Sequence, residues 1–389
     1  WQLAPTREFA RATLGTVGPV TKEIMDAKPG VYAVGDQAGL SGLQRRYDDR
    51  LRGRPGVTVV LRRTDAQGKV NETQLWHRPP EPGAPLKTTL DPRVQRAADD
   101  ALKTQPKRSA IVAVRVSDGA TLAVANGPDG GGVDLALTAQ VPPGSTFKMV
   151  SAIGLLDRGA VRADDVVACP RTFTVDGRSF KNDNDFSLGD VPFHTNFARS
   201  CNTAFASLAA KLGPDGLAEA GRSVGLGVPW DLGVEAFSGS VSSGGSAVEQ
   251  AAASFGQGTT LVSPVALAAA TAAVARGRWQ QPRFLLDPAP AAPAPEGPEL
   301  KTATVEPLRA MMREVVTAGT GQALADVPGA PVYGKTGTAE FDNADPNRTH
   351  SWFIGWQGDI AFAVFVEDGG SSSAAAVPLT EAFLRNLAR

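Results

Sequence analysis

The chain has 389 residues and a formal net charge of −1, and 20% of its residues are charged. This length suggests two or three domains and is ample for a large core. The balanced charge, without a basic stripe or an acidic tail, argues against nucleic acid or a polyanion as a partner. Because there are only two cysteines and three scattered histidines, we predict no metal site, no Ser-His-Asp triad and no cofactor.

Three features bear on the compartment and on membrane attachment. Cys169 and Cys201 can form one disulfide if the protein lies outside the cytoplasm, or they can remain as two buried thiols. The chain starts at Trp1 rather than at methionine, so we expect a signal peptide or an N-terminal membrane anchor to be absent from it. The uncharged stretch 250–274 is long enough for a membrane span, but its polar residues and proline favour a buried, alanine-rich helix over 265–275.

Residues 1–85 predict a small accessory module. An amphipathic helix that continues through Tyr47 is followed by a predicted strand over 57–61. The segment 79–85, Pro-Pro-Glu-Pro-Gly-Ala-Pro, is stiff and rich in turn signals, as is typical of a domain boundary. We therefore predict one domain over residues 1–85 and a second over residues 86–389.

The predicted second domain has strands near both of its ends and helices between them. A helix capped by Asp91 opens it, and the turn 117–119 predicts a hairpin. The predicted strands cover 110–116, 120–125, 332–340, 351–357 and 359–366. Residues 150–320 are predicted to be mostly helical, with a Pro/Ala-rich loop over 288–298, and a final amphipathic helix covers 378–387. We therefore predict a mixed α/β (α+β) fold, with one mainly antiparallel five-stranded sheet flanked by helices.

The sequence Pro-Pro-Gly-Ser-Thr-Phe-Lys at 142–148 carries the first chemical pattern. Apolar residues at helical spacing follow it, and Gly159 stands where a helix would end, so we predict a helix over 145–158. Ser145 and Lys148 then lie on one face of its first turn, where free N–H groups favour a developing negative charge. This pair fits a serine nucleophile with an amine base, but taken alone it fits better an N-cap serine beside a surface lysine.

Two further short patterns follow, Ser200-Cys201-Asn202 and Lys335-Thr336-Gly337-Thr338. Each is weak alone, but the three stand in one order along the chain. In this combination the sequence resembles the serine penicillin-recognising acyltransferases, whose motifs are Ser-x-x-Lys, Ser-x-Asn and Lys-Thr-Gly. The resemblance extends from about residue 86 to the C-terminus.

Shorter sequence segments strengthen the resemblance. Phe255-Gly256-Gln257-Gly258 and Trp352-Phe353-Ile354-Gly355 look like segments of penicillin-binding protein transpeptidases. The segment 42–56 is similar to the pedestal region of the class B, monofunctional enzymes, and no length remains for a glycosyltransferase domain. The arginine-rich box that usually lies near the start of class B pedestals is not recognisable here, so the N-terminal module departs from the family pattern.

The resemblance implies a peptidoglycan D,D-transpeptidase with a penicillin-binding, β-lactamase-like fold and a pedestal module. Ser145 would attack the carbonyl of a D-Ala-D-Ala peptide, with Lys148 as its base and Ser200 as a relay of the proton. Asn202 would hold Lys148 and the substrate amide in register. Crowding by the cation of Lys335, together with partial burial, would lower the pKa of Lys148.

The same resemblance implies the substrate contacts. Lys335, Thr336 and Thr338 would bind the terminal carboxylate, and the backbone N–H groups of Ser145 and Thr338 would form the oxyanion hole. Gly337 would leave room for a substrate that lies along the strand. The predicted substrate-binding residues are Thr336, Gly337, Thr338 and Cys201.

Partners, location and alternatives are likewise implied by the resemblance. Peptidoglycan stem peptides would be the substrates, and β-lactam antibiotics would mimic the donor and stay attached. A membrane-embedded glycosyltransferase and other cell-wall synthesis or division proteins would be partners, at the extracytoplasmic face of the bacterial membrane. A D,D-carboxypeptidase, with water as acceptor, and a β-lactam sensor or non-catalytic wall protein remain alternatives.

Two other functions disagree with particular residues. No Glu-x-x-Leu-Asn-type loop of a class A β-lactamase lies between the second and third motifs, and class D enzymes usually carry valine where this chain has Asn202. The segment Gly329–Thr336 matches the phosphate-binding loop pattern, but no apolar strand precedes it and no helix is predicted after it. We therefore reject nucleotide binding.

Overall fold

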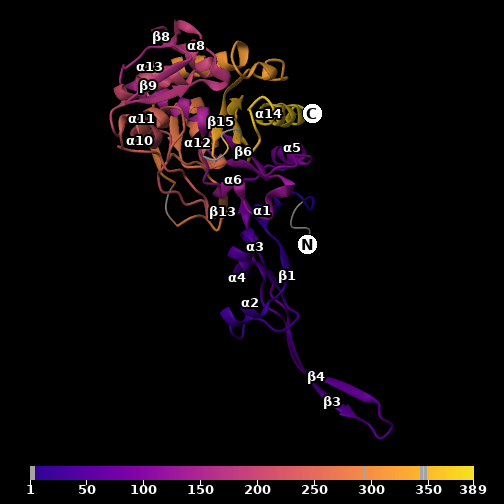
Figure 1. Cartoon of the computed structure of the whole chain (residues 1–389). Coiled ribbons are helices and arrows are strands. Elements are labelled where there is room, and N and C mark those ends of the chain that lie inside the picture. The colour runs from indigo at the N-terminus through magenta and orange to yellow at the C-terminus, as the bar shows by residue number, and fades with distance from the viewer. Residues whose placement is uncertain (1–4, 292–293, 342–344, 346–347) are drawn as a thin grey trace. The chain divides into compact units, whose positions relative to one another are not determined.

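The computed structural model describes residues 5–291, 294–341, 345 and 348–389. They form two compact units, which we describe separately (Figure 1). The smaller unit comprises Ala12–Thr88 and Leu285–Pro288, and the larger unit holds the described residues before Ala12, Thr89–Phe284 and those after Pro288. None of the helices within these described ranges has both the length and the apolar character that crossing a membrane requires.

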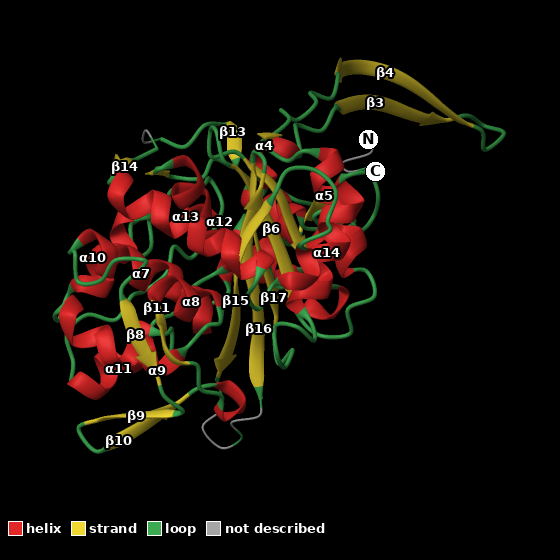
Figure 2. Ribbon diagram, turned by 90° about the horizontal axis from the view of Figure 1, so that it is seen from above, coloured by secondary structure: helices red, strands yellow, loops and turns green. Residues whose placement is uncertain are grey.

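A five-stranded antiparallel sheet forms the centre of the larger unit (Figure 2). Its strands run in the order β15 (Val332–Glu340), β16 (Thr349–Gln357), β17 (Ile360–Val366), β6 (Ser109–Arg115) and β7 (Thr121–Asn126). Most of their residues are β-branched, aromatic or small, and nearly all are buried, so both faces of the sheet are covered. The predicted five-stranded antiparallel sheet is confirmed, with β15 at its edge.

Helices cover the two faces of this sheet (Figure 2). On one face α12 (Pro264–Arg276) packs against β6, β16 and β17, and on the other face lie α5 (Pro92–Leu102) and α14 (Ala376–Leu387). Ser263 caps α12 through its side chain, and Gly277 ends the helix at φ 93°. The predicted alanine-rich helix is therefore a buried core helix rather than a membrane span.

The remaining helices of the larger unit lie mainly between β7 and β15 along the chain. They are α6 (Leu135–Thr138), α7 (Lys148–Asp157), α8 (Phe193–Ala198), α9 (Asn202–Leu208), α10 (Gly216–Ser223), α11 (Ala247–Ser254) and α13 (Thr302–Thr317). Short strands add three ribbons that the sequence did not predict. They pair β8 (Val166–Cys169) with β11 (Gly189–Pro192), β9 (Thr172–Val175) with β10 (Arg178–Lys181), and β12 (Arg278–Gln280) with β14 (Glu296–Glu299). The predicted loop 288–298 includes residues 292–293, which lie outside the described residues.

The smaller unit is built from short elements. They are α1 (Arg11–Leu14), β1 (Val17–Pro19), α2 (Lys22–Ala27), β2 (Gln37–Gly39), α3 (Gly42–Arg46), α4 (Asp48–Leu51), β3 (Val57–Thr64), β4 (Val70–Arg78), β5 (Lys87–Thr88) and β13 (Leu285–Asp287). The predicted single helix through Tyr47 is two short helices, because Tyr47 adopts φ −111° and ψ 24° between them. The buried carboxylate of Asp48 holds this region together by accepting from the Gly39 N–H at 2.9 Å and from Arg52 at 3.0 Å.

The hairpin formed by β3 and β4 is the most exposed part of the smaller unit. Every residue of both strands is exposed, and Figure 1 shows the two strands as a separate ribbon. Its large apolar side chains include Leu75 at 61% and Trp76 at 51% exposure. A two-stranded hairpin without a covering layer is only marginally stable in water, and nothing in the smaller unit covers the described residues of this one.

Candidate active site

Ser145 lies on a tight turn that is held from two sides. The predicted helix begins here as a 3₁₀ turn and becomes α-helical at Lys148 in α7. Gly144 adopts φ +52°, and a Cβ at this position would lie 2.3 Å from the carbonyl oxygen of Thr338. The Gly144 N–H donates to the Gly256 carbonyl at 3.1 Å. The turn is therefore fixed between the edge strand β15 and the loop after α11, and only glycine fits at its start.

The amine of Lys148 joins the first two motifs. The side chain is completely buried, and Nζ lies 2.9 Å from Ser145 Oγ and 2.6 Å from Asn202 Oδ1. The same Nζ lies 2.9 Å from the Ser200 carbonyl oxygen and 3.2 Å from Ser200 Oγ. Asn202 Nδ2 donates to the Lys181 carbonyl at 3.1 Å, so the amide oxygen of Asn202 must face the amine.

These contacts suit a neutral amine in a particular orientation. A neutral amine has two N–H bonds and one lone pair, and the carbonyl oxygens of Ser200 and Asn202 can only accept hydrogen bonds. Once the two N–H bonds point at these oxygens, the lone pair is left for a hydroxyl proton. Ser145 Oγ, at 2.9 Å, then stands where it can donate its proton to Lys148.

The hydroxyl of Ser200 lies between two lysines. Lys335 Nζ donates to Ser200 Oγ at 2.9 Å and to the Thr336 carbonyl at 3.1 Å. Ser200 adopts φ +62°, a left-handed conformation that is uncommon for residues other than glycine. This conformation presents both its carbonyl and its hydroxyl to Lys148, and such local strain is typical of functional sites. The structure therefore brings together all five predicted catalytic residues.

Both lysines are buried, and burial disfavours their charged forms. Burial lowers the pKa of Lys335 to about 7. The pKa of Lys148 lies well below its usual value, first because of burial and second because of the cationic Lys335. The predicted direction of the Lys148 shift is confirmed, although its burial is complete rather than partial. The carboxylate of Asp183 acts in the opposite direction and raises the pKa of both lysines.

The two lysines predict a bell-shaped pH dependence. Acylation requires neutral Lys148, whereas binding of a substrate carboxylate requires charged Lys335, so the rate falls at low pH and again above about pH 7. Because the Asp183 carboxylate raises both pKa values, Asp183→Asn lowers them, and the alkaline limb is expected to move to lower pH. The second-order rate of acylation by a penicillin, measured across pH, tests this.

The matched control for that measurement is Asp185→Asn. Asp185 lies in the same turn, but its carboxylate is 3.6 Å from Lys181 Nζ. We expect the control to leave the alkaline limb where it stands in the wild type. An alkaline limb that does not move in Asp183→Asn would contradict the charge assignment for Lys335.

The two threonines of the third motif have hydroxyl partners that the sequence did not indicate. Thr336 Oγ1 lies 2.5 Å from Thr320 Oγ1, and Thr338 Oγ1 lies 3.4 Å from Ser372 Oγ. Ser372 also donates to the Gly337 carbonyl at 2.7 Å. The two threonines that are predicted to bind a substrate carboxylate therefore lie beside further hydroxyl groups, those of Thr320 and Ser372.

Gly337 is required for a reason that the sequence did not indicate. A Cβ on Gly337 would lie 2.6 Å from Thr146 Cγ2 and 3.1 Å from the Pro143 carbonyl oxygen. A side chain here would thus collide with the turn that carries Ser145, whatever substrate is bound. Gly337 allows close approach between β15 and the nucleophile.

Cys201 is placed differently from the prediction. It forms a disulfide with Cys169, which settles the two possibilities that the sequence left open. Its side chain has no exposed surface, so it cannot touch a bound peptide, and the predicted substrate contact through this side chain is wrong. The disulfide instead ties the second motif to the end of β8.

The sequence missed the residues that surround the two amines. The rings of Phe205 and Phe255 lie 5.6 and 5.9 Å from Lys148 Nζ, and the ring of Phe197 lies 5.7 Å from Lys335 Nζ. These aromatic faces bury the lysines while still interacting favourably with a cation. Phe205 follows Asn202 by three residues on α9, a helical spacing that could have indicated its place beside the site.

The segment Gly329–Thr336 does not form a phosphate-binding loop. Lys335 and Thr336 lie within β15, which continues to Glu340, whereas a phosphate-binding loop requires a helix after its Gly-Lys-Thr. Lys335 is fully buried and directed at Ser200. Among the residues that the structure describes, no cluster of metal ligands occurs.

Two family models match nearly the whole chain. The penicillin binding protein transpeptidase domain matches residues 109–387, and the penicillin-binding protein dimerisation domain matches residues 4–88. Peptidoglycan D,D-transpeptidase PbpA of Mycobacterium tuberculosis is 28% identical over 341 residues, which cover 74% of this chain and 68% of that protein. Peptidoglycan D,D-transpeptidase MrdA of Acinetobacter baumannii is 27% identical over an alignment of 445 positions, which covers 98% of this chain and 65% of that protein.

Solved structures agree with these matches. A chain of a peptidoglycan synthase complex superposes with a TM-score of 0.82 at 24% identity, over 96% of this chain and 74% of that one. Pseudomonas aeruginosa PBP2 superposes with a TM-score of 0.78 at 25% identity, over 97% and 88% of the two chains. The ceftriaxone acyl-enzyme of penicillin-binding protein A from M. tuberculosis gives 0.72 at 23% identity, over 80% and 81%. The transpeptidase match covers more than half of the chain, and the chain belongs to the penicillin-binding protein transpeptidase family, with the two-module organisation of the class B enzymes.

Proposed function

We propose that this chain is a peptidoglycan D,D-transpeptidase that cross-links stem peptides through an acyl-enzyme on Ser145. The observation that carries the proposal is the environment of Lys148. Its buried amine is held by the carbonyl oxygens of Ser200 and Asn202, so that its lone pair faces Ser145 Oγ at 2.9 Å. A serine beside an uncharged amine is an activated nucleophile.

Acylation balances as follows. Ser145 Oγ attacks the carbonyl carbon of the penultimate D-Ala, its proton passes to Lys148, and the carbonyl oxygen becomes an oxyanion. Backbone N–H groups of Ser145 and Thr338 stabilise that oxyanion, a contribution worth about 3 kcal/mol per donor. When the C–N bond breaks, the leaving D-Ala amine receives a proton through Ser200, which contacts Lys148 and Lys335. Lys335, with Thr336 and Thr338, binds the terminal carboxylate.

Deacylation runs the same steps with an amine of a second stem peptide as the nucleophile. That amine attacks the ester carbonyl and loses a proton through Ser200 to Lys148. The bond between the acyl carbon and Ser145 Oγ then breaks, and Lys148 returns the proton to Ser145 Oγ. Two of the glutamates between the second and third motifs are engaged elsewhere. Glu219 pairs with Arg158, and Glu249 caps α11. These contacts support slow hydrolysis and, as a consequence, a long-lived adduct with β-lactams.

The test is intact-protein mass after mixing with a penicillin, combined with turnover of a D-Ala-D-Ala donor peptide in the presence of an amine acceptor. We expect a stable adduct of one penicillin, carried by Ser145, and a cross-linked product from the peptides. Free D-Ala without cross-linked product would indicate a D,D-carboxypeptidase. A stable adduct without any peptide turnover would indicate a sensor or scaffold protein, and an adduct that clears within seconds would indicate a hydrolase.

We also propose that residues 1–85 form a pedestal that binds partner proteins at the outer face of the bacterial membrane. The exposed hairpin of β3 and β4 supports this, since its apolar residues have no covering layer within the smaller unit. The polymerising partner would be a membrane-embedded glycosyltransferase, because the domains that this chain matches are a transpeptidase and a dimerisation domain. Other cell-wall synthesis or division proteins would bind the same module.

Charge substitutions on the hairpin test the pedestal proposal. Leu75→Glu and Trp76→Glu are expected to abolish co-purification with the glycosyltransferase while acylation by penicillin stays unchanged. Val34→Glu is the control, since Val34 is 89% exposed but lies outside the hairpin. Co-purification that survives both hairpin variants would contradict the proposal.

A further inference from the structure

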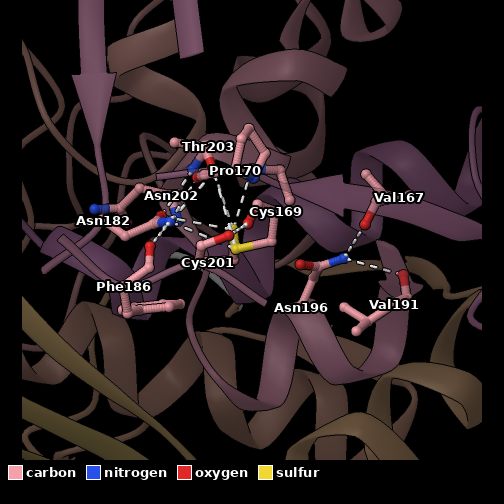
Figure 3. Close-up of a disulfide and its surroundings, with 12 residues drawn as sticks. Val167, Cys169, Pro170, Asn182, Phe186, Val191, Asn196, Cys201, Asn202 and Thr203 are labelled. Carbon is pink, nitrogen blue, oxygen red and sulfur yellow. Dashed lines mark hydrogen bonds between the residues drawn. A yellow bond between two sulfur atoms is a disulfide. The ribbon is translucent and has the colours of Figure 1, made fainter. Parts of the chain in front are cut away.

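Asn182 lies directly after β10 and immediately behind the Ser-Cys-Asn motif (Figure 3). Its side chain is 1% exposed, and its Oδ1 accepts from the backbone N–H of Asn202 at 2.8 Å and of Thr203 at 3.1 Å. These two N–H groups open α9 and have no acceptor within the helix. Asn182 therefore caps α9 from the turn after β10, 20 residues before Asn202 in the chain.

The other half of the Asn182 amide is also engaged. Nδ2 donates to the Phe186 carbonyl at 2.9 Å and to the Pro170 carbonyl at 3.0 Å. Because N–H groups face Oδ1 and carbonyl oxygens face Nδ2, only one orientation of the amide fits. The loop after β8, the turn after β10 and the start of α9 are thus joined by a single buried side chain.

This arrangement continues to the catalytic amine. Asn182 holds the backbone of Asn202, while the neighbouring Lys181 carbonyl accepts from Asn202 Nδ2 at 3.1 Å. Asn202 Oδ1 in turn lies 2.6 Å from Lys148 Nζ and takes one of the two N–H bonds of the neutral amine. The direction of the Lys148 lone pair toward Ser145 therefore depends on where Asn202 is held.

We propose that Asn182 is a positioning residue for proton transfer from Ser145 to Lys148. It touches neither the substrate nor the reacting atoms, and it acts by fixing Asn202, which fixes the amine. The inference rests on the proposed function, since it concerns formation of the acyl-enzyme. A small displacement of a catalytic group slows the reaction far more than it weakens binding. We therefore expect loss of the Asn182 side chain to lower the rate of acylation rather than the affinity for a penicillin.

The chain offers a matched control in Asn196 (Figure 3). Asn196 is fully buried in α8 and lies close to the Cys169–Cys201 disulfide in the figure. Its Nδ2 donates to the Val167 carbonyl at 2.8 Å. The side-chain hydrogen bonds of Asn196 go to carbonyls around β8 and β11 and not to the second motif. Asn182→Ala and Asn196→Ala therefore each remove one buried amide from the same region, but only the first releases Asn202.

The experiment measures the acylation rate at saturating penicillin, the apparent affinity and the thermal unfolding of the two variants. We expect Asn182→Ala to slow acylation about 10- to 100-fold with little change in affinity, and Asn196→Ala to acylate at the wild-type rate although it is also destabilised. If the two variants acylate at equal rates, the positioning role of Asn182 is wrong but the proposed function stands. If the wild type is not acylated at Ser145, both the proposed function and the positioning role are wrong.

Asn182→Asp tests the role of the amide oxygen of Asn182 separately from that of its N–H groups. The carboxylate keeps an oxygen for the N–H groups of Asn202 and Thr203 but loses the donations to Phe186 and Pro170. On the plateau of its pH profile, this variant is expected to acylate within a few-fold of the wild type while unfolding at a lower temperature. If Asn182→Ala does not fold, Asn182→Asp tests the positioning role instead. Slow acylation by Asn182→Asp contradicts the proposed role of the Oδ1 acceptor.

Discussion

Lys148→Met is expected to slow acylation by a penicillin about 10⁴-fold, nearly to the background of Ser145→Ala. The methionine fills a similar space but has no lone pair on nitrogen, so the Ser145 hydroxyl keeps its proton. Since nucleophile and base act as one unit, the double variant should be no slower than either single variant. Labelled penicillin followed by intact mass measures all three rates.

The stability of the same variant separates loss of chemistry from loss of fold. The buried amine of Lys148 has carbonyl and hydroxyl partners but no carboxylate among its hydrogen-bond partners, and burial of its charged form is unfavourable. Lys148→Met is therefore expected to unfold at or above the wild-type temperature. Ser151→Ala, one turn further along α7, should acylate normally despite losing its bond to the Ser254 carbonyl. Near-normal acylation by Lys148→Met would contradict the base assignment.

Removal of the disulfide is the second change with a large expected effect. Cys169 and Cys201 are separated by 32 residues, and a crosslink closing a loop of that length stabilises a protein by about 3.5 kcal/mol through the unfolded chain. Cys201 also lies between Ser200 and Asn202, so its release loosens these two partners of Lys148. We expect the Cys169→Ser, Cys201→Ser double variant to lose this stability and to acylate more slowly.

Denaturant unfolding with and without a reductant measures that loss. The reduced wild type and the double variant should unfold at similar denaturant concentrations, and the reductant should leave the double variant unchanged. Unchanged stability in the double variant would show that the ribbon and helix contacts around β8 hold the motif without the disulfide. The acylation rate of the reduced wild type then tells how far the crosslink itself positions Asn202.

Most of the fold could be predicted from local signals in the sequence. The five strands of the sheet and the capped helices α5 and α12 were predicted because their signals are local: period-2 or continuous apolar runs for the strands, and an N-cap residue followed by proline for the helices. The ribbons β8–β11 and β12–β14 were missed because their strands are short and largely exposed, and each pairs segments that are separated along the chain. The β9–β10 hairpin closes over Asp176-Gly177, so its turn signal is local, although we did not predict it.

The catalytic residues could be named from three short motifs because family members keep them in one order, but their chemistry could not be read from spacing alone. Lys148 and Lys335 lose water because Phe197, Phe205 and Phe255 surround them, and these rings come from three separate segments. Burial, in turn, sets the pKa of both lysines. No local pattern specifies such a three-dimensional enclosure.

The sequence by itself determined the family and the sheet, and it named the candidates for the nucleophile, its base and their partners, since each depends on residue type and order along the chain. Only the tertiary structure decided that Gly337 makes room for the Ser145 turn, that Cys201 is crosslinked rather than in contact with substrate, and that Asn182 caps α9 from outside it. The physical reason is the same in each case. A collision, a crosslink and a cap all depend on the distance between atoms that the chain separates widely, and folding alone sets that distance.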